Sequence, residues 1–314
     1  MNKLTIVIPA FNEEEVLPST LEKLFQIEDQ LIAAAKIAPD SAILVVDDGS
    51  KDQTWNIIEQ LHAQNERVSG IKFSRNFGHQ DALLAGMEAA MQTADLIVTI
   101  DADLQDNPEM IIKMVGKYDE GNDIVYGVRN NRQQDTWFKR TTAVGYYKFL
   151  NLLGVRVIPN HADFRLMSKR AVKTLLEYKE RNLFLRGIVP MLGYQSAEVF
   201  YERTPRLAGE SKYPLKKMLA FAWDGITSLT IAPVRAVLLL GILVSFVGIL
   251  ALIFTIVVKI MGKANEGWSS IIISIWILGG FQMISLGIIG EYIGKVTTEV
   301  KHRPRYTIEK RIGK

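Results

Sequence analysis

The chain has 314 residues, of which 48% are hydrophobic and 23% are charged, with a net charge of +3 and no cysteine. This composition excludes a wholly disordered chain, and the lack of cysteine excludes disulfides, thiolate zinc sites, iron–sulfur clusters and a cysteine nucleophile. The small net charge gives no reason to expect nucleic acid as a partner, and four scattered histidines do not favour a histidine-rich metal site.

The first 130 residues alternate between apolar runs and segments with helical spacing. We expect strands at residues 4–8, 42–46, 69–74, 95–100 and 123–127, and helices at residues 14–37, 53–64, 80–91 and 108–118. Uninterrupted apolar strands that alternate with helices predict an α/β fold, a mostly parallel sheet with helices on both faces. Ligands of such sheets bind beyond the carboxyl ends of the strands, so functional residues are expected there.

Acidic and amide side chains follow the expected strands. Asp101 and Asp103 lie two residues apart at a strand end, where both carboxylates can turn toward one cation, and Gln105 follows them. Such oxygen ligands suit Mg²⁺ or Mn²⁺. Asp47 and Asp48 end the second strand and can accept hydrogen bonds from a nucleobase or a ribose, although a DGS turn also commonly caps a helix.

Three common site motifs are missing from the sequence. No GxGxxG follows the first strand, and neither GxxxxGK[ST] nor GxSxG occurs. The sequence therefore argues against a Rossmann dinucleotide site, a P-loop and a hydrolase nucleophile elbow.

Two long apolar runs mark the C-terminal third. Residues 236–258 and 269–290 contain no charge, and each is long enough to cross a bilayer as a helix. Lysine and arginine concentrate before the first run and after the second, which places both chain ends in the cytoplasm and the connecting loop outside. Residues 214–231 have the pattern of an amphipathic helix on the membrane surface; the alternative is an ordinary helix of the soluble domain.

This pattern predicts four parts. A cytoplasmic domain spans residues 1–210, and an interfacial helix spans residues 211–231. A membrane hairpin follows at residues 232–294, with spans at about 233–258 and 269–291, and residues 295–314 form a basic tail.

Several motifs occur in an order that is typical of one family: PAFNEEE, VVDDGSKDQT, SRNFGHQDALLAG, DADLQDNPE, ADFRLMSKR, RLAGESKY and IGEYIGKV. The chain resembles the polyprenyl-phosphate glycosyltransferases, membrane-anchored members of glycosyltransferase family 2 of the bactoprenol glucosyltransferase and dolichol-phosphate mannose synthase type. The resemblance covers nearly the whole chain. It implies a GT-A fold, a nucleotide-sugar donor, Mg²⁺ or Mn²⁺, a polyprenyl-phosphate acceptor such as undecaprenyl phosphate, the cytoplasmic membrane, and a homo-oligomer, a tetramer in relatives.

The resemblance also implies roles for individual residues. Asp101, Asp103 and Gln105 would hold the metal, and the nucleotide would contact Pro9, Phe11, Glu13, Asp47 and Asp48. Arg129 and Arg140 would bind the acceptor phosphate, while Arg206 and Lys212 would belong to a mobile loop that clamps phosphates. Asp163 matches the proposed catalytic aspartate of the family.

The chemistry narrows the role of Asp163. The family pattern is an inverting displacement by a lipid phosphate, which is largely dianionic at neutral pH and hardly needs a general base. Asp163 is therefore expected to orient the acceptor, the sugar or a neighbour such as Arg165. The alternative is a structural aspartate that pairs with Arg165 or Arg170.

The donor sugar stays open between UDP-glucose and UDP-GlcNAc, with a GDP-mannose-using enzyme as a further alternative. A processive polysaccharide synthase is disfavoured because QxxRW is missing and two spans are too few to line a polymer channel. A phosphohydrolase with Asp101 as nucleophile is disfavoured because the acidic pair follows the fourth strand rather than the first. A non-enzymatic scaffold is the remaining alternative.

Overall fold

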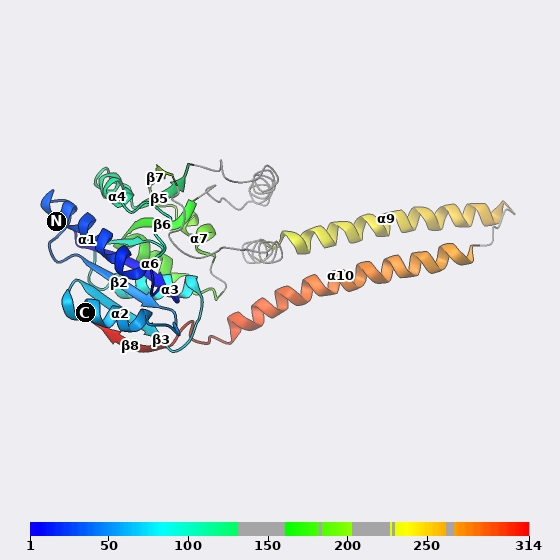
Figure 1. Cartoon of the computed structure of the whole chain (residues 1–314). Coiled ribbons are helices and arrows are strands. Elements are labelled where there is room, and N and C mark those ends of the chain that lie inside the picture. The colour runs from blue at the N-terminus through cyan, green and yellow to red at the C-terminus, as the bar shows by residue number, and fades with distance from the viewer. Residues whose placement is uncertain (131–160, 182–183, 203–226, 228–229, 262–266, 314) are drawn as a thin grey trace. The chain divides into compact units, whose positions relative to one another are not determined.

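The computed structural model describes residues 1–130, 161–181, 184–202, 227, 230–261 and 267–313 (Figure 1). The chain divides into two compact units. The first comprises Met1–Pro214 together with Arg303–Lys314, and the second comprises Leu215–His302.

Eight strands of the first unit form one mixed sheet in the order β7-β5-β6-β4-β1-β2-β3-β8. Four of them run parallel at its centre: β1 (Leu4–Ala10), β2 (Ala42–Asp47), β3 (Val68–Phe73) and β4 (Leu96–Thr99). Ala10 pairs with Asp47, so β1 and β2 end at the same edge of the sheet. Their loops therefore meet at one place.

The remaining strands extend the sheet on both sides. β6 (His161–Ser168) lies antiparallel between β4 and β5 (Ile124–Arg129), and β7 (Ser196–Tyr201) pairs parallel with β5. β8 (Ile308–Ile312) pairs antiparallel with β3 at the opposite side. Because β6 runs against its neighbours, its first residues lie at the edge where β1, β2, β4 and β5 end.

Helices cover both faces of the sheet. α1 (Leu17–Ala33), α2 (Thr54–Gln64) and α4 (Met110–Asp119) bury apolar side chains against one face, where Leu4, Ile6 and Ile8 belong to the same core cluster. α3 (His79–Ala90), α6 (Lys169–Glu177) and α7 (Leu185–Met191) pack on the other face. A Cβ at Gly86 of α3 would lie 2.2 Å from Val7 Cγ1, so α3 approaches β1 too closely for any other residue.

The second unit contains two long helices, α9 (Ala232–Ile260) and α10 (Trp268–Val300), which form a hairpin (Figure 1). Among the described residues, two segments are long and apolar enough to cross a membrane: Ala232–Ala251, with a mean hydropathy of 2.5, and Ile277–Val300, with a mean hydropathy of 1.3. Leu239, Phe246 and Met283 illustrate their exposed apolar side chains. Such surface needs an apolar environment.

The predicted α/β sheet with helices on both faces is confirmed, as are the five expected strands. The sequence did not predict β6, β7 or β8, and β8 falls within the expected basic tail. Helix α10 continues to Val300, beyond the expected end of the second span. Most of the expected interfacial helix, residues 211–231, lies outside the described residues.

Candidate active site

A pocket of about 310 Å³ opens at the carboxyl ends of β1, β2 and β4. The loop after β1 contributes Phe11, the loop after β3 contributes Asn76, and the loop after β4 contributes Asp101 and Asp103. The complete lining is Pro9, Ala10, Phe11, Glu13, Asp48, Asn76, Gly78, His79, Ala82, Asp101, Ala102 and Asp103. Six of the residues expected in the site from sequence therefore line one pocket: Pro9, Phe11, Glu13, Asp48, Asp101 and Asp103.

The loops after β1 and β2 are bound to each other. The Asn12 amide donates to Ser50 Oγ at 2.9 Å, and Asn12 Oδ1 accepts from the Lys51 amide at 2.9 Å. The Glu13 amide donates to Thr54 Oγ1 at 2.9 Å. These bonds fix the wall that carries Phe11, a residue that is 42% exposed and lines the pocket.

Gly49 closes the turn after β2 against the loop after β3. Its φ is +70°, and a Cβ there would lie 2.3 Å from the carbonyl carbon of Arg75. Both the backbone conformation and the close approach require glycine. The DDGS turn therefore sets the spacing of two walls of the pocket.

The two aspartates at the end of β2 have different partners. Asp48 accepts from the amides of Phe77 at 2.7 Å and Gly78 at 2.9 Å, so it holds the loop after β3. Asp47 is fully buried; its Oδ1 accepts from the Ser50 amide at 2.9 Å, whereas Oδ2 has no hydrogen-bond partner among the described residues. Burial raises the pKa of Asp47. A buried acceptor without a donor is suited to a ligand N–H or hydroxyl.

The acidic pair Asp101 and Asp103 lines the same pocket. Asp101 Oδ1 is buried and accepts no hydrogen bond within the described part of the chain. Burial raises the pKa of Asp101 to about 6, and the carboxylates of Asp163, Asp106 and Asp103 act in the same direction against His79. Such crowding of like charges is what a bound cation relieves.

The residues present fit a divalent cation. The carboxylate oxygens are hard ligands, and Asp103 Oδ1 also accepts from the Gln105 amide at 3.2 Å, which orders the loop. Gln105 is buried. Across the described ranges, no three histidine or acidic side chains form a complete ligand set. An ion held here by this pair would take its other ligands from water and phosphate oxygens, as Mg²⁺ and Mn²⁺ do.

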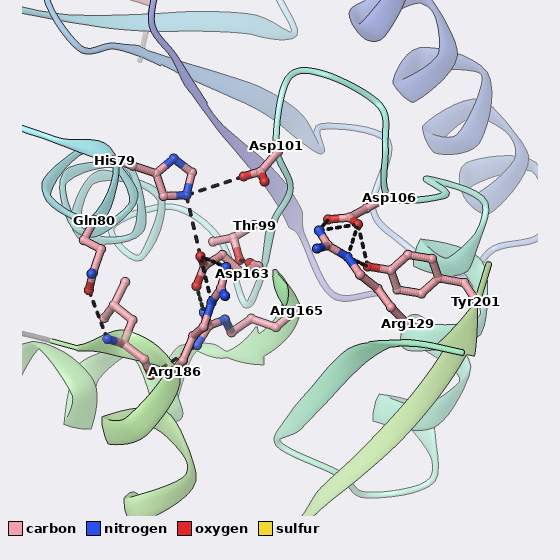
Figure 2. Close-up of polar contacts among 11 residues, drawn as sticks. His79, Gln80, Thr99, Asp101, Asp106, Arg129, Asp163, Arg165, Arg186 and Tyr201 are labelled. Atoms are coloured by element: carbon pink, nitrogen blue, oxygen red, sulfur yellow. Dashed lines mark hydrogen bonds and ion pairs between the residues drawn. The ribbon is translucent and has the colours of Figure 1, made fainter. Parts of the chain in front are cut away.

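Asp163, near the start of β6, lies between two arginines (Figure 2). Its Oδ1 accepts from Arg165 Nη2 at 2.5 Å, and its Oδ2 accepts from Arg186 Nη2 at 2.9 Å. Burial alone would raise the pKa of Asp163, but Arg186 and Arg165 outweigh it and hold the pKa well below its usual range. A carboxylate that is so firmly ionised is a weak base.

His79 connects the acidic pair to Asp163. Figure 2 shows its ring between the two carboxylates, with Nε2 3.5 Å from Asp101 Oδ1 and 3.7 Å from Asp163 Oδ2. Gln80 Oε1 accepts from the Leu185 amide at 3.1 Å, which ties α3 to the helix that carries Arg186. We did not predict a role for His79 or Arg186 from sequence, although His79 belongs to the quoted SRNFGHQDALLAG motif.

Arg129, at the end of β5, is held by Asp106 and Tyr201 (Figure 2). Its Nε and Nη2 donate to the two Asp106 oxygens at 2.9 and 3.1 Å, and Tyr201 Oη donates to Asp106 Oδ1 at 2.6 Å. The guanidinium is fixed at the same edge of the sheet as the acidic pair. Asp106 and Tyr201 were not predicted from sequence, and Arg140, Arg206 and Lys212 lie outside the described residues.

Comparisons with known proteins show the family of the chain. A family model described as "Glycosyl transferase family 2" matches residues 5–176. The chain is 54% identical over 306 residues to the glycosyltransferase YkoT of Bacillus subtilis, covering 98% of this chain and 91% of that one. It is 38% identical over 312 residues to the bactoprenol glucosyl transferase of Shigella phage SfX, covering 98% and 99%.

A solved structure supports the fold alone. Mannosyl-3-phosphoglycerate synthase from Rubrobacter xylanophilus is 16% identical, with a TM-score of 0.50 over 71% of each chain. The shared architecture is the GT-A-like sheet with helices on both faces.

Proposed function

Because the chain belongs to glycosyl transferase family 2, we propose that it transfers a hexose from a UDP-sugar, UDP-glucose or UDP-GlcNAc, to a polyprenyl phosphate such as undecaprenyl phosphate. It is a glycosyltransferase. The observation that carries the proposal is the convergence of Phe11, the acidic pair and His79 on one pocket at the carboxyl edge of the sheet. The name of the phage SfX relative, which matches over nearly its full length, supports the choice of acceptor.

The donor would lie in the pocket with its base near β2. The unsatisfied Oδ2 of Asp47 would accept from a base N–H, and the exposed ring of Phe11 would contact the base or the ribose. Pro9, Glu13 and Asp48 complete this part of the site. Asp101, Asp103 and Gln105 would hold Mg²⁺ or Mn²⁺, which neutralises the diphosphate leaving group.

The reaction is a single displacement at the anomeric carbon. An oxygen of the lipid phosphate attacks from the face opposite the leaving group, a new C–O bond forms, and the bond to UDP breaks with its electron pair on the diphosphate. The configuration inverts and no covalent enzyme intermediate forms. The dianionic acceptor carries no proton that must be removed, so positioning and charge placement supply the rate.

Asp163 acts in this scheme through its arginines. Its carboxylate pairs with Arg186 and Arg165 and lies 3.7 Å from His79, which lines the pocket, so the two guanidinium groups would place positive charge near the reacting phosphates. Arg129 would bind the acceptor phosphate, since a guanidinium held by a carboxylate has a fixed orientation. Arg140, Arg206 and Lys212 are proposed for the same phosphates.

We propose that α9 and α10 anchor the enzyme in the cytoplasmic membrane, with the catalytic unit and both chain ends in the cytoplasm. The lysine and arginine bias around the two apolar helices supports this topology. Such an anchor would hold the catalytic unit at the membrane surface, where the phosphate of a lipid acceptor lies. We also propose a homo-oligomer.

A donor panel tests the function. Purified full-length protein is incubated with Mn²⁺, undecaprenyl phosphate and each of UDP-glucose, UDP-GlcNAc and GDP-mannose, and the lipid products are identified by mass spectrometry. We expect a hexose-phosphate lipid from one UDP-sugar and none from the Asp101→Asn variant. Release of free sugar without a glycolipid would contradict the proposal, and a product from GDP-mannose alone would overturn the donor assignment.

A further inference from the structure

The segment that follows α10 packs along the strand leading to the donor pocket. In the β3–β8 pair, Gly70 lies opposite Ile312 and Phe73 lies opposite Ile308. Beyond this pair, the Ser74 amide donates to the Thr307 carbonyl oxygen at 3.0 Å. The C-terminal segment therefore follows β3 to its carboxyl end, where the loop of the pocket begins.

Tyr306 is the main side-chain contact at this end. Its ring stacks on Phe73, with centroids 4.9 Å apart and an interplanar angle of 12°. Its Oη donates to Glu88 Oε2 at 2.5 Å, on helix α3. Burial, together with the bond to Glu88, raises the pKa of Tyr306, so the hydroxyl keeps its proton and remains a donor. Tyr306 thus joins the end of β3 to α3.

Phe73 in turn contacts the loop at residues 74–78, which follows β3. Phe77 meets Phe73 edge to face at 5.6 Å, and the Arg75 guanidinium lies 3.9 Å from the centre of the Phe77 ring. The same loop presents Asn76 and Gly78 to the pocket. The aromatic contacts Tyr306–Phe73 and Phe73–Phe77 therefore link the C-terminal segment to a wall of the pocket.

Arginines hold the segment on the N-terminal side of Tyr306. Arg305 Nη2 donates to the carbonyl oxygens of Tyr178 at 3.1 Å and Glu180 at 2.5 Å. Arg181 donates to the carbonyl oxygens of Arg303 at 3.2 Å and Arg305 at 3.3 Å. These side-chain-to-backbone bonds fix the path of the segment, so it is an integral part of the catalytic unit.

We propose that Tyr306 is a positioning residue of the donor site: it holds Phe73 and the 74–78 loop in the conformation that binds the nucleoside diphosphate. The chain downstream of α10 is then part of the nucleotide-binding machinery rather than a free basic tail. This inference rests on the proposed function only in that the pocket takes a nucleoside diphosphate.

The test compares three variants of the full-length protein. UDP is titrated in the presence of Mn²⁺ into Tyr306→Ala, Tyr306→Phe and Ile312→Ala. Tyr306→Ala is expected to raise the Kd about fivefold, which corresponds to about 1 kcal/mol, because the aromatic stack is lost. Tyr306→Phe keeps the stack and should bind nearly as the parent chain does.

Ile312→Ala is the matched control for a merely structural role. Ile312 lies at the far end of β8, opposite Gly70, and packs against the core cluster. Its truncation should lower Tm and leave the UDP Kd unchanged. If Tyr306→Ala does not fold, Tyr306→Leu removes the ring with less loss of volume and should show the same weakening.

Amide hydrogen exchange separates failure of this inference from failure of the proposed function. The Phe77 and Gly78 amides are bonded to Asp48, and we expect them to exchange faster in Tyr306→Ala than in Ile312→Ala, with no ligand present. If the parent chain binds no UDP, the proposed function fails and the exchange result still decides the role of Tyr306. The inference would be overturned if these two amides exchanged equally fast in Tyr306→Ala and Ile312→Ala. It would also be overturned if Tyr306→Ala bound UDP with the same Kd as the parent chain.

Discussion

Asp163→Asn removes a charge on which two arginines depend. Arg165 is 2% exposed, and its Nη2 lies 2.5 Å from Asp163 Oδ1; Arg186 lies 2.9 Å from Oδ2. Breaking a buried ion pair by removal of one partner costs about 3–5 kcal/mol. At about 2–4 °C per kcal/mol for a domain of this size, Tm should fall by about 10 °C.

The same substitution should reduce turnover because Arg186 loses its orientation. Displacement of a positioning group costs about 100-fold in rate, measured here as glycolipid formation with donor and lipid both saturating. Arg186→Gln is the matched control: it removes the same contact, leaves the Asp163–Arg165 pair, and should lose similar turnover with a smaller fall in Tm. Near-parental turnover in Asp163→Asn would refute a role in catalysis.

The pH dependence distinguishes positioning from base catalysis. The pKa of Asp163 is lower in the folded chain than in the unfolded chain. Its ionisation therefore makes its full contribution to the free energy of unfolding above the unfolded pKa of about 4, and this contribution is lost only as the pH falls below that value. Turnover of the parent chain should therefore show no acidic limb from Asp163 between about pH 5 and 8. An acidic limb that disappears in Asp163→Asn would identify the residue as the base and contradict our interpretation.

Three further substitutions test other parts of the structure. Glu28 is fully buried, and burial raises its pKa to about 8 despite Arg67, so the stability of the folded chain should fall as the pH rises from 4.5 to 8. Glu28→Gln should remove that slope and stabilise the protein by about 3 kcal/mol at pH 7, as measured by chemical denaturation; an unchanged slope would show that Glu28 does not cause it. Arg129→Gln should raise the KM for lipid phosphate about tenfold through loss of a charged hydrogen bond, with the UDP Kd unchanged; an equal loss of donor affinity would count against an acceptor role. Gly49→Ala should weaken UDP binding and lower Tm together, whereas Gly116→Ala on α4, where a Cβ meets nothing within 4 Å, should do neither.

The centre of the sheet was predictable because its strands are locally apolar. β1 and β4 are buried throughout, β2 is buried after Ala42, and each strand is followed by a segment with helical spacing. β6 gives no such signal: all eight of its residues are buried, yet it contains Asp163 and Arg165, which neutralise each other only in the folded structure. The sequence of β8 resembles a charged tail because Glu309, Lys310 and Arg311 separate its two isoleucines. Its pairing with β3 depends on residues more than 200 positions away in the chain.

Some residues of the candidate site could be predicted from sequence, and others could not. The acidic pair and Asp47 were predictable since they follow strands that end at one edge of the sheet. His79 and Arg186 come from two helices, α3 and α7, and only the folded structure brings them to Asp163. The partner of Arg129 was equally hidden, because Asp106 lies 23 positions earlier in the chain.

Titration of UDP into the full-length protein in detergent, with and without Mn²⁺, probes the acidic pair most directly. We predict that the parent chain binds UDP only when Mn²⁺ is present and that Asp101→Asn loses this binding while it remains folded. UDP binding that needs no divalent cation, or that persists unchanged in Asp101→Asn, would show that the donor is held elsewhere.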